Sequence, residues 1–72
     1  MNEFLKTSLN NFLESENISN ITFAEWYGTT PNYVSQMRNG HRNIDLSKFA
    51  SALTRNGYEF KIDFKKMKFD YI

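Results

Sequence analysis

Apolar residues recur along most of the chain at the spacing of a helix face, and this period changes near the C-terminal end. In the first segment Leu5, Leu9, Phe12 and Leu13 repeat at intervals of three and four residues, which places them on one side of a helix. From Tyr58 onward apolar and charged residues alternate instead, which is the period of a strand. The pattern therefore predicts a mainly α chain with a short C-terminal β-strand or hairpin tail.

Two short helices joined by a tight turn are predicted between residues 20 and 40. The apolar residues of their shared seam are Phe23, Ala24, Tyr27, Val34 and Met37. Helices this short can share one seam only if they cross steeply, and Gly28 can adopt the positive φ that such a corner requires. We expect Thr30 to cap the second helix, with Pro31 at its first position and Asn39-Gly40 as its stop.

Further helices are predicted before and after this pair. The first helix is expected to begin at Asn2 and to end near residues 16–17, and the second is capped by Ser19 or Thr22. Asp45 is expected to cap a fourth helix that Gly57 ends. Its expected apolar face consists of Leu46, Phe49, Ala50 and Leu53. The expected organisation is a four-helix domain over residues 1–57 and a strand-like tail over residues 58–72.

The order of a small residue, a turn glycine and an apolar pair resembles the helix-turn-helix of the phage Cro and repressor family. The residues that carry this resemblance are Phe23, Ala24, Gly28, Thr29, Thr30, Val34, Met37, Asn39 and Gly40. The resemblance covers residues 19–53, and the helix-turn-helix itself lies at about residues 20–40. It implies a four-helix Cro/repressor-like domain that binds double-stranded operator DNA and regulates transcription in the cytoplasm of a bacterial host.

The residues expected to meet DNA lie on the second helix of the pair and around its ends. Amide groups pair with N6 and N7 of adenine, and the family places outward residues of this helix at base edges. The expected base-reading residues are Asn32, Ser35 and Gln36. The expected phosphate contacts are Ser19, Asn20, Thr29, Arg38, Asn39, His41 and Arg42. A polar helix face in contact with solvent is the alternative interpretation.

Composition narrows the classes of function. The chain has 72 residues, no cysteine and a single histidine, His41, which we expect in a surface loop. With no glycine-rich phosphate loop and no spaced acid pair, we expect neither an enzyme nor a small-molecule substrate, metal or cofactor. No three apolar residues are adjacent, so we expect no signal peptide or membrane span, and a cytoplasmic location.

Charge is unevenly distributed along the sequence although the net charge is only +1. Residues 1–27 contain four Glu and one Lys, whereas residues 28–72 contain eight Lys or Arg and four acids. Such a gradient could orient the protein on a polyanion, and an unevenly charged solvated surface explains it equally well.

A protein partner is the second interpretation of the same fold. Trp26 falls at the edge of the predicted core, and Pro31 and Tyr33 flank the outward face, so these three are candidates for a protein interface. Trp26 packed against the first helix or the tail is the plainer alternative. A modulator of repression, an anti-repressor that binds a phage repressor protein and blocks its DNA-binding helix, would use such a surface.

The C-terminal tail leaves further alternatives. A strand on a helical domain must pair with another strand, and Lys65-Lys66 is poor hairpin-turn chemistry. The tail is therefore expected to pair between chains, as in a homodimer, or else to pack over the first helix. An antitoxin whose tail pairs with a toxin is a third candidate function.

Overall fold

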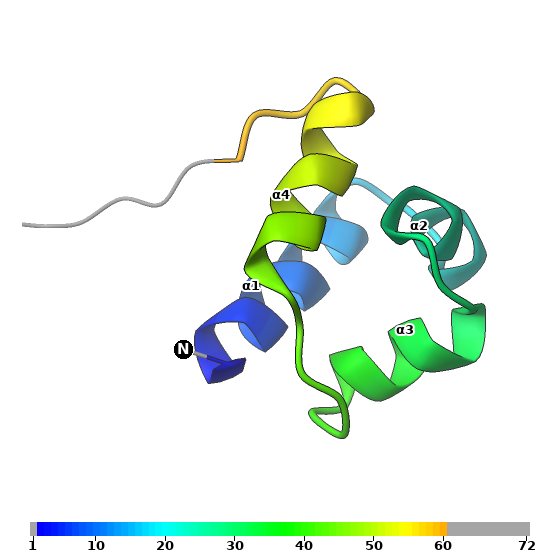
Figure 1. Ribbon diagram of the computed structural model, residues 1–72, viewed down its shortest axis with the longest axis vertical. Coiled ribbons are helices and arrows are strands. Elements are labelled where there is room, and N and C mark those ends of the chain that lie inside the picture. Colours follow the sequence, from blue (N-terminus) through cyan, green and yellow to red (C-terminus); the bar gives the residue numbers. More distant parts are fainter. Residues whose placement is uncertain (1, 61–72) are drawn as a thin grey trace, which may run out of the picture.

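The computed structural model describes residues 2–60, which form four helices (Figure 1). The helices are α1 (Asn2–Ser15), α2 (Asn20–Tyr27), α3 (Pro31–Arg38) and α4 (Leu46–Arg55). Helix α2 packs against both α3 and α4, and α1 packs against α3. The prediction of a mainly α chain is confirmed over the described residues. Predictions for residues 61–72, including the poor hairpin turn at Lys65-Lys66 and pairing between chains, lie outside them.

A single hydrophobic core joins the four helices. Its buried residues are Leu5, Leu9, Leu13, Phe23, Ala24, Tyr27, Val34, Met37, Ile44, Phe49, Ala52 and Leu53. The rings of Phe23 and Phe49 meet edge to face with centroids 6.0 Å apart, which ties α2 to α4. Ala24, on α2, is almost fully buried in the core, and α2 packs against α3.

The predicted apolar face of α4 is wrong at two positions. Leu46 is 38% exposed and Ala50 is only half-buried, whereas Ala52 is fully buried. The reason lies in the loop before the helix, where Ile44 is buried and fills the core ahead of the first turn. The helix therefore turns Phe49, Ala52 and the following leucine inward, and its first residue faces solvent.

Local hydrogen bonds explain where α2, α3 and α4 begin. The Ser19 hydroxyl accepts from the Thr22 N–H at 3.1 Å, so Ser19 and not Thr22 caps α2. Thr30 Oγ1 accepts from the Tyr33 N–H at 3.1 Å, with proline in the first turn of α3. Asp45 accepts from the N–H of residue 48 in the same way and caps α4. The predicted caps of α3 and α4 are confirmed.

The turn between α2 and α3 has the predicted geometry. Gly28 has φ of 89°, and its N–H and that of Thr29 both donate to the carbonyl of Ala24, at 2.8 and 2.9 Å. Gly28 therefore ends α2 in the left-handed conformation, and α3 begins only three residues later.

Residues 58–60 are not in a strand, so the predicted strand is wrong over this part of the tail. The ring of Tyr58 meets that of Phe12 edge-on at 4.9 Å, and the ring of Phe60 lies 5.2 Å from that of Phe49. The Tyr58 N–H donates to the Leu53 carbonyl at 2.9 Å. These aromatic side chains cover the core, which holds the backbone against the helices instead of in an alternating strand.

Candidate nucleic-acid interface

Helix α3 is buried along one edge and polar along the other. Val34 and Met37 are completely buried against the rest of the core. On the remaining surface of α3, Asn32 is exposed and Ser35 and Gln36 are half-buried. We call Asn32, Ser35 and Gln36 the reading face; the structure places all three predicted base-reading residues on this one helix.

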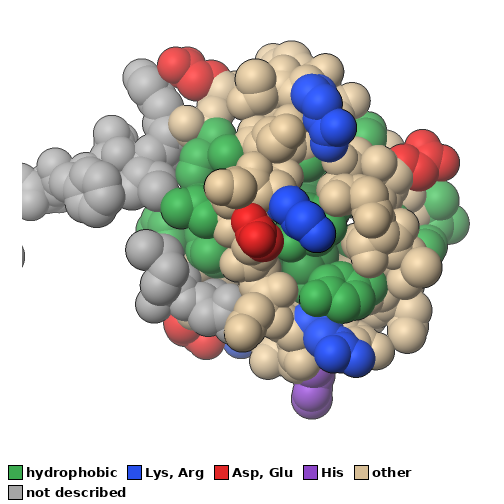
Figure 2. Space-filling view, viewed as in Figure 1, with side chains coloured by type: hydrophobic (Ala, Val, Ile, Leu, Met, Phe, Trp, Pro, Cys, Tyr) green, Lys and Arg blue, Asp and Glu red, His purple; other side chains and the backbone are tan. Residues whose placement is uncertain are grey.

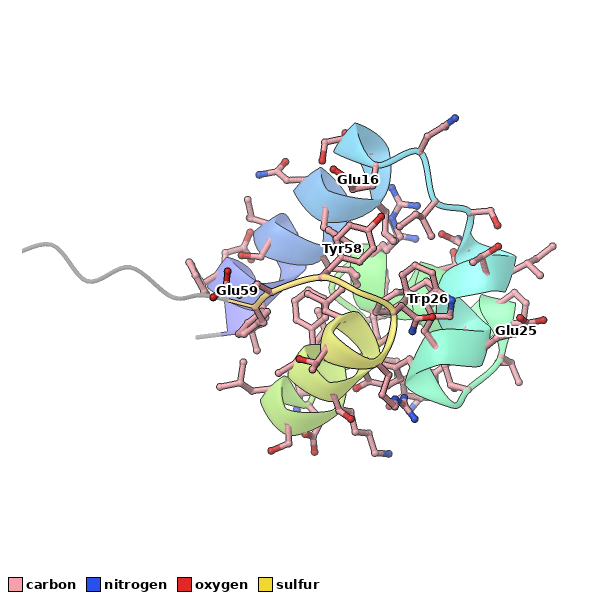
Figure 3. The ribbon with its side chains drawn as sticks, turned by 90° about the horizontal axis from the view of Figure 1, so that it is seen from above. Glu16, Glu25, Trp26, Tyr58 and Glu59 are labelled. Carbon is pink, nitrogen blue, oxygen red and sulfur yellow. The ribbon has the colours of Figure 1, made fainter. Side chains whose placement is uncertain are left out.

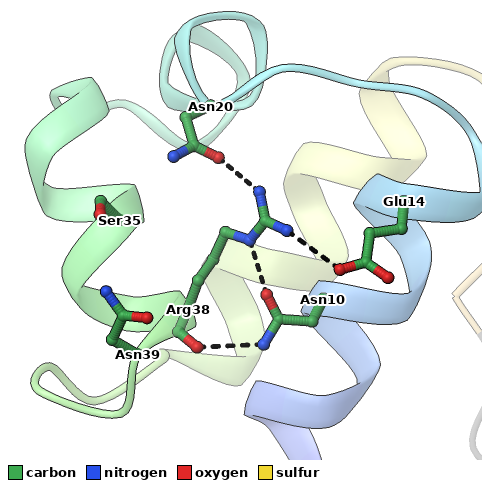
Figure 4. Close-up of a pocket in the computed structure, with 6 residues that line it drawn as sticks. All are labelled: Asn10, Glu14, Asn20, Ser35, Arg38 and Asn39. Atoms are coloured by element: carbon green, nitrogen blue, oxygen red, sulfur yellow. Dashed lines mark hydrogen bonds and ion pairs between the residues drawn. The ribbon is translucent and has the colours of Figure 1, made fainter.

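A polar pocket lies on one flank of the reading face, between α1, α2 and α3 (Figure 4). Its lining residues are Asn10, Glu14, Asn20, Ser35, Arg38 and Asn39. Four of these were expected from the sequence to meet DNA, and the structure brings them together. The two from α1, Asn10 and Glu14, were missed; their signal was a pair of polar residues one turn apart beside the apolar stripe of α1.

Arg38 is bound inside this pocket by other side chains. Its Nε donates to Asn10 Oδ1 at 2.6 Å, and its Nη1 donates to Asn20 Oδ1 at 2.8 Å. Its Nη2 lies 3.5 Å from a carboxylate oxygen of Glu14, and Asn10 Nδ2 donates to the Arg38 carbonyl at 3.0 Å. Figure 4 shows three of these contacts at the guanidinium and the fourth at the Arg38 backbone carbonyl. The geometry favours a structural role, joining α3 to α1 and α2, over the predicted phosphate contact.

The loop after α3 folds back over the other flank of the reading face. The Arg42 guanidinium lies over the Tyr33 ring, 5.5 Å from its centroid, and Arg42 Nε donates to Gln36 Oε1 at 2.6 Å. The backbone N–H of His41 donates to the Gln36 carbonyl at 2.8 Å, and the His41 side chain is exposed. The loop thus brings a positive charge to a helix face that has none of its own.

Thr29 lies in a second hollow, between the turn and α4. Tyr27, Thr29, Tyr33, Asp45 and Lys48 are among its lining residues. Lys48 Nζ lies 5.9 Å from the centroid of the Tyr27 ring, and the Tyr27 hydroxyl accepts from the Asp45 N–H at 3.0 Å. Burial of the Tyr27 side chain raises the pKa of its phenol. Because Lys48 lines the same hollow as Thr29, it adds a cation beside that residue. Sequence reasoning missed this cation because the two residues are far apart along the chain.

The three candidate residues for a protein interface, Trp26, Pro31 and Tyr33, lie in different environments. Trp26 is half-buried, and its ring lies 6.3 Å from that of Phe23 and 6.1 Å from that of Tyr58. Figure 3 shows Trp26 beside Tyr58 with Glu16 close by, and the Tyr58 hydroxyl donates to Glu16 Oε1 at 3.2 Å. Tyr33, on α3, instead lies beneath the guanidinium of Arg42. Pro31, on the same helix, is exposed. Packing against the tail is thus the observed environment of Trp26.

Basic and acidic side chains are interspersed on the face seen in Figure 2, and the histidine lies beside a lysine or arginine at its lower end. Within residues 2–60, no group of His, Asp or Glu side chains is arranged to hold a metal ion. None of the four described helices is long and apolar enough to cross a membrane. No protein-family model, curated protein or solved structure matches the chain.

Proposed function

We propose that the chain is a helix-turn-helix regulator of transcription, of the small Cro-like type, that binds operator DNA through α3. The observation that supports this proposal is the contrast between the two edges of α3. Val34 and Met37 are completely buried and fix the helix, while the reading face carries the amide of Asn32, the hydroxyl of Ser35 and the amide of Gln36, whose oxygen also accepts from Arg42. The major groove admits an α-helix and presents base edges that pair with such groups.

Phosphate contacts in this proposal come mainly from the side of α3 that faces α4. Arg42 and Lys48 lie there, together with Thr29 at the turn and the exposed side chain of His41. Helix-turn-helix proteins bind two half-sites as dimers, so two copies would double this small set of cations. Each phosphate contact contributes about 0.9 to the slope of log affinity against log salt, so a shallow slope is expected.

A second candidate is a modulator of repression, an anti-repressor that binds a repressor protein and blocks its DNA-binding helix. Two observations favour it. Within residues 2–60 the acidic side chains outnumber the basic ones. On α2, Ile21 is 63% exposed and lies one turn from the exposed Glu25. An exposed apolar side chain beside a carboxylate suits a basic protein surface better than it suits DNA.

Mobility shifts on the operator region distinguish the two candidates. The measurement is made at two salt concentrations, with and without the cognate repressor. A salt-sensitive shift by the protein alone supports DNA binding. No shift alone, but an altered shift of the repressor, supports the anti-repressor. Failure of both arms would refute both candidates.

Matched variants assign each activity to a surface. Asn32→Ala with Gln36→Ala removes the amides of the reading face and should abolish sequence preference in DNA binding without unfolding the protein. Ile21→Lys changes only the outward side of α2 and should leave DNA binding intact while abolishing any effect on the repressor. Unchanged sequence preference in the double variant would remove the base-reading assignment.

A further inference from the structure

The two flanks of α3 differ in the cations that they offer to a phosphate backbone. On the flank that faces α4, Arg42 and Lys48 lie near the reading face. On the flank that faces α1, the guanidinium of Arg38 donates to Asn10 and Asn20 inside the polar pocket. A helix in the major groove has a phosphate backbone on each side, and contacts to both backbones fix its orientation. The flank that faces α1 therefore needs another cation.

Helix α1 supplies a cation beside the C-terminal end of α3. Lys6, Asn10 and Glu14 follow one another at intervals of four residues, so they lie on one side of α1. Asn10 and Glu14 contact Arg38, as Figure 4 shows. One turn earlier on α1, a Cβ added to Gly40 would lie 3.4 Å from Lys6 Cδ and 3.7 Å from Lys6 Nζ. The Lys6 ammonium therefore lies beside the backbone that follows α3, at the end of the same flank.

The ammonium of Lys6 is available to an anion. Its ion pair is with Glu3, whose Oε2 lies 3.3 Å from Lys6 Nζ and whose side chain is 80% exposed. An exposed pair of this kind is weak, because water and salt screen it. The Lys6 side chain is itself 30% exposed, and an ammonium has three N–H donors, so a phosphate oxygen can accept from one of them. Gly40 is exposed and has no side chain that would cover the ammonium.

We propose that Lys6 is a phosphate-contacting residue and that α1 is thereby part of the nucleic-acid interface. This inference rests on the proposed function of DNA binding, and it assigns to Lys6 the contact that was expected of Arg38. Lys6 is the one lysine or arginine of residues 1–27, so only the fold brings it to α3. A cation at the C-terminal end of a helix also stabilises that helix through its dipole, and an experiment has to separate this structural effect from a phosphate contact.

The salt dependence of DNA binding separates the two roles. Affinity for a duplex of the operator region and for an unrelated duplex of equal length is measured by fluorescence anisotropy between about 50 and 200 mM salt. The wild type is compared with Lys6→Met, which keeps the aliphatic stem, and with Lys6→Arg, which keeps the charge. Arg55→Met is the matched control, because it removes a positive charge whose described donors are directed to the carbonyls of Ser51 and Trp26. Circular dichroism checks that each variant is folded.

Lys6→Met should make the slope of log affinity against log salt shallower by about 0.9 per chain. The change should be the same on both duplexes, because a phosphate contact does not depend on sequence. The loss of affinity should then be about three to four times larger at the lower salt concentration than at the higher one. Lys6→Arg and Arg55→Met should retain the wild-type slope.

Glu3→Gln gives a second readout that does not depend on the folding of Lys6→Met. It removes the carboxylate that competes with phosphate for Lys6, at an exposed position outside the core. Affinity at the lower salt concentration should rise by about twofold, and an unchanged or lower affinity would count against the inference.

A folded Lys6→Met variant with the wild-type slope, whether or not its affinity falls, would overturn the inference and leave DNA binding standing. Equal changes of slope in Lys6→Met and Arg55→Met would do the same, because they would show an effect of net charge alone. If the wild type binds neither duplex, the proposed function fails and this inference fails with it.

Discussion

Replacing Arg38 by methionine tests whether the polar pocket between α1, α2 and α3 stabilises the fold. Methionine is a flexible unbranched side chain that keeps the packing of the aliphatic stem but has no donor. The change would leave the oxygens of Asn10 and Asn20 without their donors and would remove the ion pair with Glu14. We therefore expect a clear loss of stability.

The size of the loss follows from the geometry of these contacts. A hydrogen bond that involves a charged group stabilises a protein by about 1.5–3 kcal/mol. The Arg38 side chain is 24% exposed, so water can replace part of the interaction. The Glu14 side chain is 71% exposed, and its ion pair adds at most about 1 kcal/mol. We expect Arg38→Met to lower the free energy of unfolding by about 2 kcal/mol, out of roughly 4–10 kcal/mol for a chain of this length.

Urea unfolding followed by the fluorescence of Trp26 measures this change. With a slope near 1 kcal/mol per molar urea, the midpoint should fall by about 2 M. Arg42→Met is the comparison variant: that arginine is exposed, so water replaces most of its contacts to Gln36 and Tyr33, and its expected change is below about 1 kcal/mol. A double-mutant cycle with Asn10→Ala should give a coupling free energy of about 1 kcal/mol. Equal midpoints for the two arginine variants would show that Arg38 is not structural and restore it as a phosphate contact.

Three further changes test the turn, a cap and a buried phenol. Gly28→Ala should cost about 1–2 kcal/mol in urea unfolding through its φ of 89° alone, since an added Cβ meets nothing within 4 Å. A much larger loss would indicate a clash. Thr30→Ala should cost about 1 kcal/mol and Thr30→Ser much less, and equal losses would argue against the cap. Burial raises the pKa of Tyr27 above its ordinary value of 10.0, so the contribution of Tyr27 to the free energy of unfolding should be fully present below about pH 10 and be lost as pH rises through the higher folded pKa. Tyr27→Phe should reduce this alkaline fall in pH-dependent unfolding, with a remainder from Tyr58, whose pKa is also raised; an unchanged fall would be contrary evidence.

Those parts of the fold that depend on neighbouring residues could be predicted from the sequence. The caps by Thr30 and Asp45 and the left-handed turn at Gly28 follow from side chains and backbone atoms within four residues of one another. The inward face of α4 could not be predicted in the same way. It depends on Ile44 entering the core from a loop, and the periodicity of the helix contains no information on that packing.

The candidate site likewise has a part that local sequence predicts and a part that depends on tertiary contacts. The reading face follows from helical periodicity, because Val34 and Met37 fix the buried edge and the polar residues must lie elsewhere. The partners of Arg38 and Arg42 do not follow from it. The contact of Arg38 with Asn10 depends on how α1 approaches α3, and the contact of Arg42 with Gln36 depends on a loop that returns to the helix. Both are tertiary contacts.

Part of the basic charge in the second part of the sequence is engaged by contacts within the folded body, and this bears on how DNA could be held. Arg38 is paired with Glu14, and Arg55 donates to the carbonyl of Trp26. Of the basic residues in the second part of the chain, these pairings leave Arg42 and Lys48 near the reading face, and the remaining four are Lys61, Lys65, Lys66 and Lys68, outside the described residues. Two cations per chain, or three with Lys6, give weak neutralisation of phosphates. Operator binding therefore requires a second copy of the chain, or those four lysines, whereas binding to a basic repressor surface requires neither.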